Sequence, residues 1–194
     1  MAMFHQGNRE LQQHFGSTDL ADRLVERLRR SEFTAEDQEF IHSVEFFFVA
    51  TATRDGQPDC SFKGGPLGFV RIVQPDLLVW PDYDGNGMFK SLGNINDNPF
   101  VGLLFIRMGA TPKRLRVNGH AKVVLEDPLM KEFVGAQALI RVTPIDIFPN
   151  CPRYIPDLAT GTPSPYVPCE GQSPVEPGWK GNPAWKDVVP PRRA

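Results

Sequence analysis

The chain has 194 residues, of which 41% are hydrophobic, and this length is sufficient to bury the core of one domain. Its 21 basic and 23 acidic side chains argue against a nucleic-acid-binding protein, which usually carries a basic excess. No apolar run approaches the roughly 20 residues of a membrane span, and the N-terminus lacks the apolar core of a signal peptide.

Two helices are predicted in the first third of the chain. In residues 18–30, apolar side chains recur at the spacing of one helix face. A second helix is predicted to begin at Thr34, because Asp37 follows three residues later in a capping-box arrangement. Both helices are expected to cover a sheet, since an isolated helical hairpin of this length would be marginally stable.

Runs of apolar and β-branched residues, separated by turn residues, predict the strands of this sheet. The runs are residues 44–53, 58–65, 68–73, 77–81, 101–106, 114–125 and 136–148. Gly56 marks a tight hairpin turn between the first two runs, and Asp127 with Pro128 predicts a short helix before the last one. Six or more strands with turns at this spacing favour a closed or nearly closed antiparallel barrel.

The chain changes character after Phe148, where proline and glycine become frequent and regular secondary structure is not expected. A disordered tail is one interpretation. The tryptophans and tyrosines of this segment favour an extended arm that packs on the barrel or on a partner, because disordered tails contain few aromatic residues. We therefore expect one domain with N-terminal helices in residues 1–44, a barrel in 45–150 and a Pro-rich arm in 151–194.

The cysteines and histidines indicate neither a disulfide framework nor a metal site. Cys60, Cys151 and Cys169 are few and scattered, which suits a reducing compartment, so a cytoplasmic protein is expected. The four histidines occur at no spacing typical of metal ligands.

The most informative segment is the loop and helix start between two predicted strands, in residues 80–106. Gly85 and Gly87 can adopt backbone angles that other residues avoid, so this loop can fold closely around a ligand. Lys90 and Ser91 follow at the start of a short helix, where free amides favour an anion. The segment therefore predicts a phosphate-binding site.

Several motifs in one order make the chain similar to a known family. They are FFVAT, DGQPDCSFKGG, PDYDGNGMFKSLGNI, NPFVGLLFI, RLRVNGHAKV and IFPNCPRYI, which together span residues 45–155. With them the chain resembles the pyridoxamine 5′-phosphate oxidase-like, FMN-binding split-barrel proteins, and in particular the broad branch outside the true vitamin-B6 oxidases. The resemblance implies a mainly β (α+β) fold with a six-stranded antiparallel split barrel. It also implies a homodimer with FMN at the subunit interface, and an oxidoreductase that transfers hydride through flavin N5.

The same resemblance supplies the expected cofactor-binding residues. Residues on the second strand would run beside the flavin ring and its ribityl chain, and residues near the short helix would hold the phosphate. Arg153 would complete the phosphate site, from the same or the partner subunit. The expected set is Ser61, Phe62, Lys63, Asn86, Gly87, Lys90, Ser91, Asn94 and Arg153.

The chain departs from the family pattern at two points. Where the true oxidases carry an Arg-Lys pair, this chain has Lys90 and Ser91, so one positive charge is lost. The residues that bind the substrate phosphate in those oxidases have no clear match, which argues against pyridoxamine phosphate as the substrate. No side chain is identified as a catalytic acid or base. Two alternatives therefore remain open: a split barrel that uses deazaflavin F420 or haem, and a non-catalytic protein that stores or senses flavin.

Overall fold

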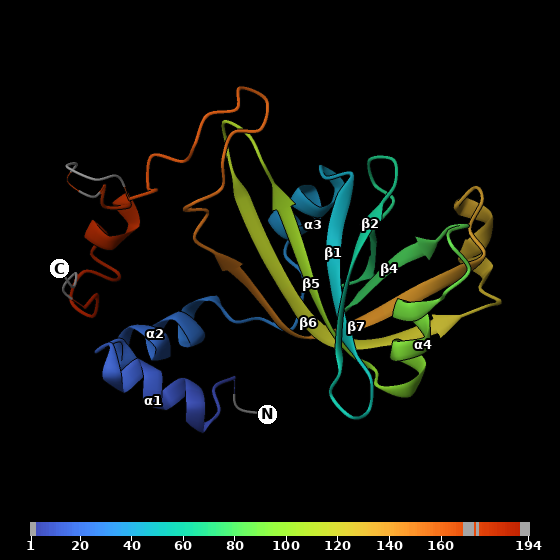
Figure 1. Ribbon diagram of the computed structural model, residues 1–194, viewed down its shortest axis with the longest axis horizontal. Helices are drawn as coiled ribbons and strands as arrows, with labels where there is room; N and C mark the ends of the chain where they lie inside the picture. Colours follow the sequence, from blue (N-terminus) through green and yellow to red (C-terminus); the bar gives the residue numbers. More distant parts are fainter. Residues whose placement is uncertain (1–2, 169–172, 174, 191–194) are drawn as a thin grey trace. The chain divides into compact units, whose positions relative to one another are not determined.

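The computed structural model describes residues 3–168, 173 and 175–190 (Figure 1). Its helices are α1 (Gln6–His14), α2 (Thr18–Leu28), α3 (Ala35–His42) and α4 (Lys90–Asp97), with short 3-10 helices η1 (Pro128–Glu132) and η2 (Gly178–Gly181). Its strands are β1 (Phe46–Ala52), β2 (Pro58–Gly64), β3 (Arg71–Gln74), β4 (Leu77–Asp82), β5 (Phe100–Arg107), β6 (Lys113–Val124) and β7 (Ala138–Asn150). The chain divides into two compact units, one of residues 30–107 and 113–150, the other of the remaining segments.

Within the described residues, seven strands form one antiparallel sheet in the order β2-β1-β5-β6-β7-β4-β3. The fold is thus mainly antiparallel β with helices, as expected, but the sheet has seven strands where the resemblance implied six, and it is not closed. The sheet ends at β2 and β3, which each pair with a single neighbour. All seven apolar runs of the sequence became strands, whereas the count of six came from the resemblance. The seventh strand is β3, which has four residues and forms a hairpin with β4 at the edge of the sheet.

The long β6–β7 pair is the centre of the sheet and carries a register shift. Along β6, Leu115, Val117 and Ala121 are buried and alternate with exposed polar residues, as expected for a strand with one buried face. The shift lies between Asn118 and Gly119, opposite a part of β7 that contains Pro144. A proline cannot donate a ladder hydrogen bond, so it is tolerated at such an irregularity, and this explains the less regular alternation of β7.

One side of the sheet packs on α3 around the larger of two hydrophobic clusters. Phe40 and Ile41 of α3 are buried in the same cluster as Phe47, Trp80 and Phe105. The ring of Phe47 lies 5.2 Å from that of Trp80 and 5.1 Å from that of Phe105. Trp80 is therefore a core residue, and α3 covers the sheet as predicted.

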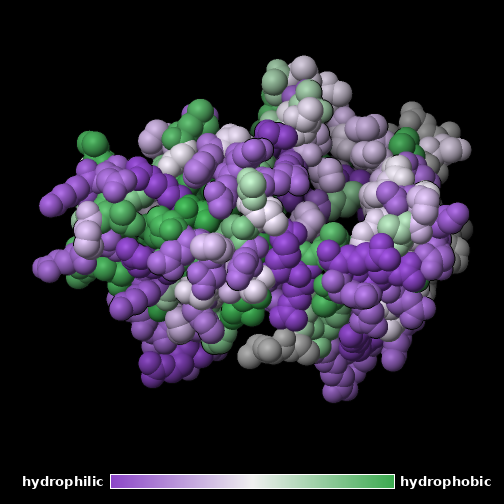
Figure 2. Space-filling view, turned by 180° about the vertical axis from the view of Figure 1, so that it is seen from behind, coloured by the Kyte–Doolittle hydropathy of each residue, from purple (hydrophilic) through white to green (hydrophobic). Residues whose placement is uncertain are grey.

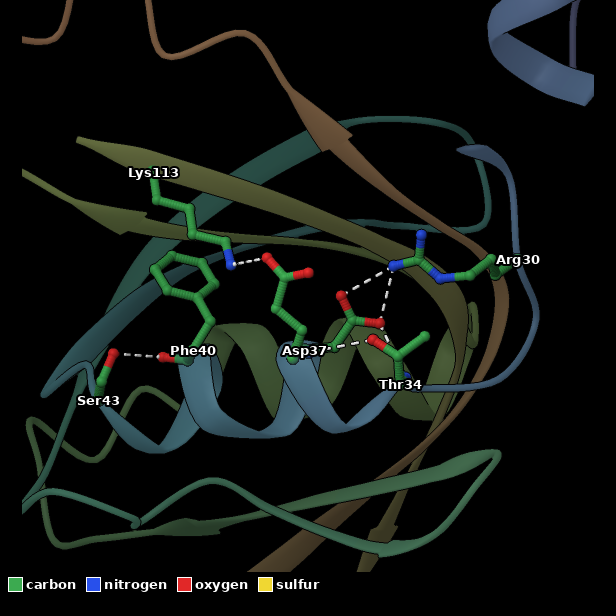
Figure 3. Close-up of polar contacts among 7 residues, drawn as sticks. Arg30, Thr34, Asp37, Phe40, Ser43 and Lys113 are labelled. Atoms are coloured by element: carbon green, nitrogen blue, oxygen red, sulfur yellow. Dashed lines mark hydrogen bonds and ion pairs between the residues drawn. The ribbon is translucent and has the colours of Figure 1, made fainter. Parts of the chain in front are cut away.

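The start of α3 is closed by its own sequence (Figure 3). Asp37 N–H donates to Thr34 Oγ1 at 3.2 Å, and Thr34 N–H donates to Asp37 Oδ2 at 2.9 Å. Arg30 Nη2 donates to both carboxylate oxygens of Asp37, at 2.8 and 2.7 Å. The predicted capping box is confirmed, and a partly buried ion pair reinforces it.

The other unit contains α1, α2, Met108–Pro112 and the segment from Cys151 onward. Arg23 of α2 donates to Asp187, and this hydrogen bond lowers the pKa of the Asp187 carboxyl and raises that of Arg23. Among the described residues after Asn150, regular structure is limited to η2 and a bridge between Asp157 and Thr162. The packing of the arm on the barrel or on a partner stays a prediction, as do the boundaries of the three segments.

The described surface is mostly hydrophilic, with separate apolar patches on the side shown in Figure 2. Within the part of the chain that the structure describes, neither Cys60 nor Cys151 forms a disulfide, and Cys169 lies outside the described residues. None of the helices in the described ranges has the length and apolar composition needed to cross a membrane.

Candidate functional site

A cavity of about 350 Å³ lies beside β2 and the start of α4, within the unit that contains the sheet. This volume is within the range of small-molecule and cofactor sites. The cavity brings together six of the residues that the resemblance implied, from segments that are distant in the sequence. They are Ser61 and Lys63 on β2, Asn86 and Gly87 in the loop after β4, and Lys90 and Ser91 on α4.

The loop between β4 and α4 folds tightly before the helix begins. Gly87 has φ +71°, in the left-handed region that favours glycine. The Asn86 side chain accepts a hydrogen bond from Met88 N–H at 3.1 Å and so stabilises this turn. Phe89, the N-cap of α4, also has a left-handed conformation, with φ +49°. A non-glycine residue in this region is under backbone strain, which often accompanies functional sites.

No described side chain caps α4, and its first turn contains no acidic residue. The amides at a helix start need acceptors, and the helix dipole favours a negative charge there. Ser91 is only 5% exposed and lines the cavity, while the Lys90 side chain is exposed at its edge. The start of α4 therefore combines unmet donors, a hydroxyl and a cation, which is the chemistry of an anion site.

Carboxylates on the cavity wall were missed in the sequence. Asp59, Asp82 and Asp84 line the cavity together with the two lysines. Asp82 is buried, and its Oδ2 accepts a hydrogen bond from Gln137 Nε2 at 2.9 Å. The same nitrogen donates to the carbonyl oxygen of Tyr83 at 3.1 Å, so Gln137 ties the start of β7 to the loop. No local motif marks Gln137, because its contacts are 54 and 55 residues away in sequence.

Three of the expected site residues do not line the cavity. The Phe62 ring stacks on Phe46 at 5.4 Å, on the opposite side of β2 from Ser61 and Lys63. Asn94 is buried, and its Nδ2 donates to Thr51 Oγ1 at 3.0 Å. Arg153 belongs to the other unit, where its Nε lies 3.2 Å from Cys151 Sγ, and its role at the cofactor stays a prediction.

A family model identifies the protein family to which the chain belongs. The model described as pyridoxamine 5′-phosphate oxidase matches residues 33–151, which is more than half of the chain and includes α3, the whole sheet and the cavity. The chain belongs to this family, as the sequence motifs indicated. No curated protein matches the sequence.

Solved structures with a similar fold share little sequence with the chain. HupZ from Group A Streptococcus has 18% identity over 68% of this chain and 98% of its own, with a TM-score of 0.48. An FMN-binding protein from Syntrophomonas wolfei has 8% identity over 75% and 96%, with a TM-score of 0.49. The haem storage protein HutZ from Vibrio cholerae has 18% identity over 58% and 90%, with a TM-score of 0.44. Because these likenesses are weak, the assignment depends on the family model.

Proposed function

We propose that the chain binds FMN in the cavity beside α4 and acts as an FMN-dependent oxidoreductase. The observation that carries this proposal is the uncapped start of α4, with the buried hydroxyl of Ser91 and the cation of Lys90 beside it. A phosphate would accept hydrogen bonds from the helix amides and the hydroxyl, and the lysine would balance part of its charge. Membership of the family supports the same cofactor.

The rest of the cavity also suits FMN. The carboxylates of Asp59, Asp82 and Asp84 can accept hydrogen bonds from the hydroxyls of a ribityl chain. Lys63 on β2 supplies a positive charge that would stabilise a reduced, anionic flavin ring. When bound, the flavin would supply the hydride chemistry at its N5, while the protein binds, orients and screens the ring.

We also propose that two copies of the chain associate through the outer side of β1 and β2. Three phenylalanine rings cluster there, since Phe62 stacks on Phe46 at 5.4 Å and lies 6.0 Å from Phe48. Phe62 is 60% exposed, and Phe100 on β5 is also exposed. A partly exposed cluster of aromatic rings, as formed by Phe46, Phe48 and Phe62, is typical of an interface. A second copy could also supply the cation that the Lys90–Ser91 pair lacks, and Arg153 is the candidate.

Absorption of the purified protein tests the cofactor assignment. A flavin spectrum, or saturable uptake of added FMN by the colourless protein, supports the proposal. Anaerobic addition of a reduced nicotinamide should bleach the bound flavin, and air should restore its colour. A protein that binds FMN but is never reduced by nicotinamides or other donors would be a storage or sensing protein. A protein that takes up F420 or haem and not FMN would contradict the proposal.

The oligomeric state tests the proposed interface separately. Light scattering should give the mass of a dimer for the wild type and of a monomer for Phe62→Glu, because the charge cannot be buried between aromatic rings. Val134→Glu is the matched control, since Val134 is also an exposed apolar residue but lies outside this cluster, and it should leave the dimer intact. A wild-type monomer would contradict the proposed interface.

A further inference from the structure

The loop segment between β4 and α4, residues 84–88, is held by few contacts. Among the described residues, its one hydrogen bond is that from Met88 N–H to the Asn86 side chain, and both partners lie within the segment. No ion pair or aromatic ring contact joins residues 84–88 to another described part of the chain. A segment with so few contacts can change its conformation at a low cost in free energy.

Both ends of this segment are fixed to the sheet. Before it, the carbonyl oxygen of Tyr83 accepts a hydrogen bond from Gln137 Nε2 at 3.1 Å. After it, α4 is held by the buried side chain of Asn94, whose Nδ2 donates to Thr51 Oγ1 of β1 at 3.0 Å. Fixed ends and a weakly held middle are the features of a loop that closes over a ligand.

The same segment carries apolar surface at the mouth of the cavity. Met88 is 73% exposed and lines the cavity, and Phe89, which follows it, is also exposed and lines the cavity. A Cβ built at Gly85 or at Gly87 meets no atom within 4 Å, so the backbone between β4 and Met88 is bordered by open space. The segment therefore has room to move, and Met88 would lose contact with water if it moved toward a bound ligand.

We propose that residues 84–88 form a flap that closes over FMN bound at the start of α4, with Met88 as the side chain that covers the ligand. The proposal rests on the proposed flavin site and deepens it. Closure removes the apolar surface of Met88 from water, and this gain offsets the cost of ordering the segment. Closure also excludes water from the phosphate, which strengthens the hydrogen bonds that it accepts from the helix amides. The flap thus slows the release of the cofactor.

Hydrogen exchange and stopped-flow mixing of the full chain with FMN test the closure. Saturation with FMN should slow the exchange of the amides in residues 84–88 by about tenfold or more, because the closed segment is ordered against the ligand. The observed rate of binding should level off at high FMN concentration, because closure follows the first encounter as a separate step. Slower exchange at Lys90 and Ser91 alone, with residues 84–88 unchanged, would overturn the proposal. Slower exchange in residues 84–88 without a plateau in the rate would also overturn it, since the ligand would then contact a segment that does not move.

Variants of Met88 test the cover itself, with the dissociation rate of FMN as the readout. Met88→Ser should release FMN about fivefold faster, as expected when a partly buried apolar side chain is lost, and its folding should not change because Met88 is exposed. Met88→Leu keeps an apolar side chain and should release FMN as the wild type does. Val134→Ser is the matched control, since Val134 is 95% exposed and lies outside the cavity lining.

The outcomes separate the flap from the site that it covers. Release of FMN by Met88→Ser at the wild-type rate would overturn the proposal while leaving the flavin site intact. Failure of the wild type to bind FMN at all would instead contradict the proposed function.

Discussion

Helices α3 and α4 belong to the same unit, but their N-termini differ. Side chains cap the start of α3, whereas no described side chain caps the start of α4. At α3, Thr34 and Asp37 satisfy each other's backbone amides, and Arg30 neutralises the carboxylate. At α4, no described side chain caps the helix, and Phe89 precedes it in a left-handed conformation. One helix start is closed within the chain, and the other is left open beside a cavity.

This difference separates residues that stabilise the fold from residues that are available for a ligand. The donors of a helix start must find acceptors, from the chain, from water or from a bound anion. The start of α3 finds its acceptors within the chain, whereas the uncapped start of α4 lies beside a hydroxyl and a lysine and is the one to which the proposed function assigns a bound phosphate. Variants at the start of α3 should therefore change stability, and variants at the start of α4 should change ligand binding.

The largest effect is expected at the closed start. Asp37→Ala removes a carboxylate whose side chain is 9% exposed and that accepts from Arg30 and from Thr34 N–H. The free energy of unfolding should fall by about 2–4 kcal/mol, measured by urea denaturation. Glu36→Ala is the control, because its ion pair with Lys113 is exposed and should contribute less than about 1 kcal/mol. The flavin affinity of the folded Asp37→Ala protein should not change, because Asp37 does not line the cavity. A loss of affinity would show that the start of α3 also contributes to flavin binding.

The open start should give the reverse pattern. Lys90→Ala should weaken FMN binding by about 1.5–3 kcal/mol, as for a lost charge-assisted hydrogen bond, with unfolding unchanged within about 0.5 kcal/mol. Riboflavin lacks the phosphate, so its affinity should be the same for wild type and variant. Lys122→Ala, which removes an exposed lysine of β6 outside the cavity lining, should leave both affinities unchanged. Equal weakening of FMN and riboflavin would place the phosphate elsewhere.

A third helix start, η1, is closed like α3 and gives a pH-dependent test. Asp127 accepts hydrogen bonds from Arg141 Nε at 2.7 Å and from Leu129 N–H at 3.0 Å, and its side chain is 2% exposed. The hydrogen bond from Arg141 holds the pKa of the Asp127 carboxyl below its ordinary value. Its stabilisation is therefore complete above the pKa of the unfolded state, roughly 3.9, and is lost as pH falls through the lower folded-state value.

Asp127→Asn should accordingly lower the free energy of unfolding at neutral pH by about 1–2 kcal/mol. The difference from the wild type should shrink as the pH is lowered below about 4, because the proton then binds the unfolded state first. It should disappear below the lower folded-state pKa, where both side chains are neutral. Denaturant titrations across this pH range measure it. Glu126→Gln changes the neighbouring exposed carboxylate and serves as control. A difference that persists unchanged at low pH would show that the Arg141 pair is not its source.

The smallest effect is expected at Phe89, because strain at the open start should be relieved by glycine. Phe89→Gly should raise the free energy of unfolding by about 0.5–1 kcal/mol, since the left-handed region is costly only for residues with a Cβ. Met88→Gly is the matched control: Met88 is exposed and has no positive φ, so the added chain freedom should destabilise it slightly. Destabilisation by both variants would mean that the left-handed conformation carries no strain.

Local features of the fold could be predicted from the residues because their causes lie within a few positions. The capping box of Thr34 and Asp37, the short helix that starts after Asp127 and the strand predicted in residues 114–125 were all confirmed. The strand count was wrong where it followed the resemblance rather than the seven apolar runs. Helix α1 was not identified, and none of its described residues is buried, so it leaves only a weak apolar signature in the sequence.

The candidate site was only partly predictable. The loop with Gly87, Lys90 and Ser91 predicted an anion site without help from the resemblance, because a glycine, a cation and a hydroxyl at a helix start are the groups that bind anions. Ser61 and Lys63 could be added only through the resemblance, since nothing local relates β2 to α4. Phe62 shared their strand but faces the other side, because neighbouring side chains of a strand alternate.

The sequence by itself therefore determined where α3 and η1 start and which runs become strands, since these depend on neighbouring residues. Only the tertiary structure decided the strand order, which inserts β5 between β1 and β6, and the meeting of β2 with the start of α4. It alone brought Gln137 to Asp82. These features depend on contacts between residues far apart in the chain, which are fixed by packing of the whole sheet rather than by any local pattern.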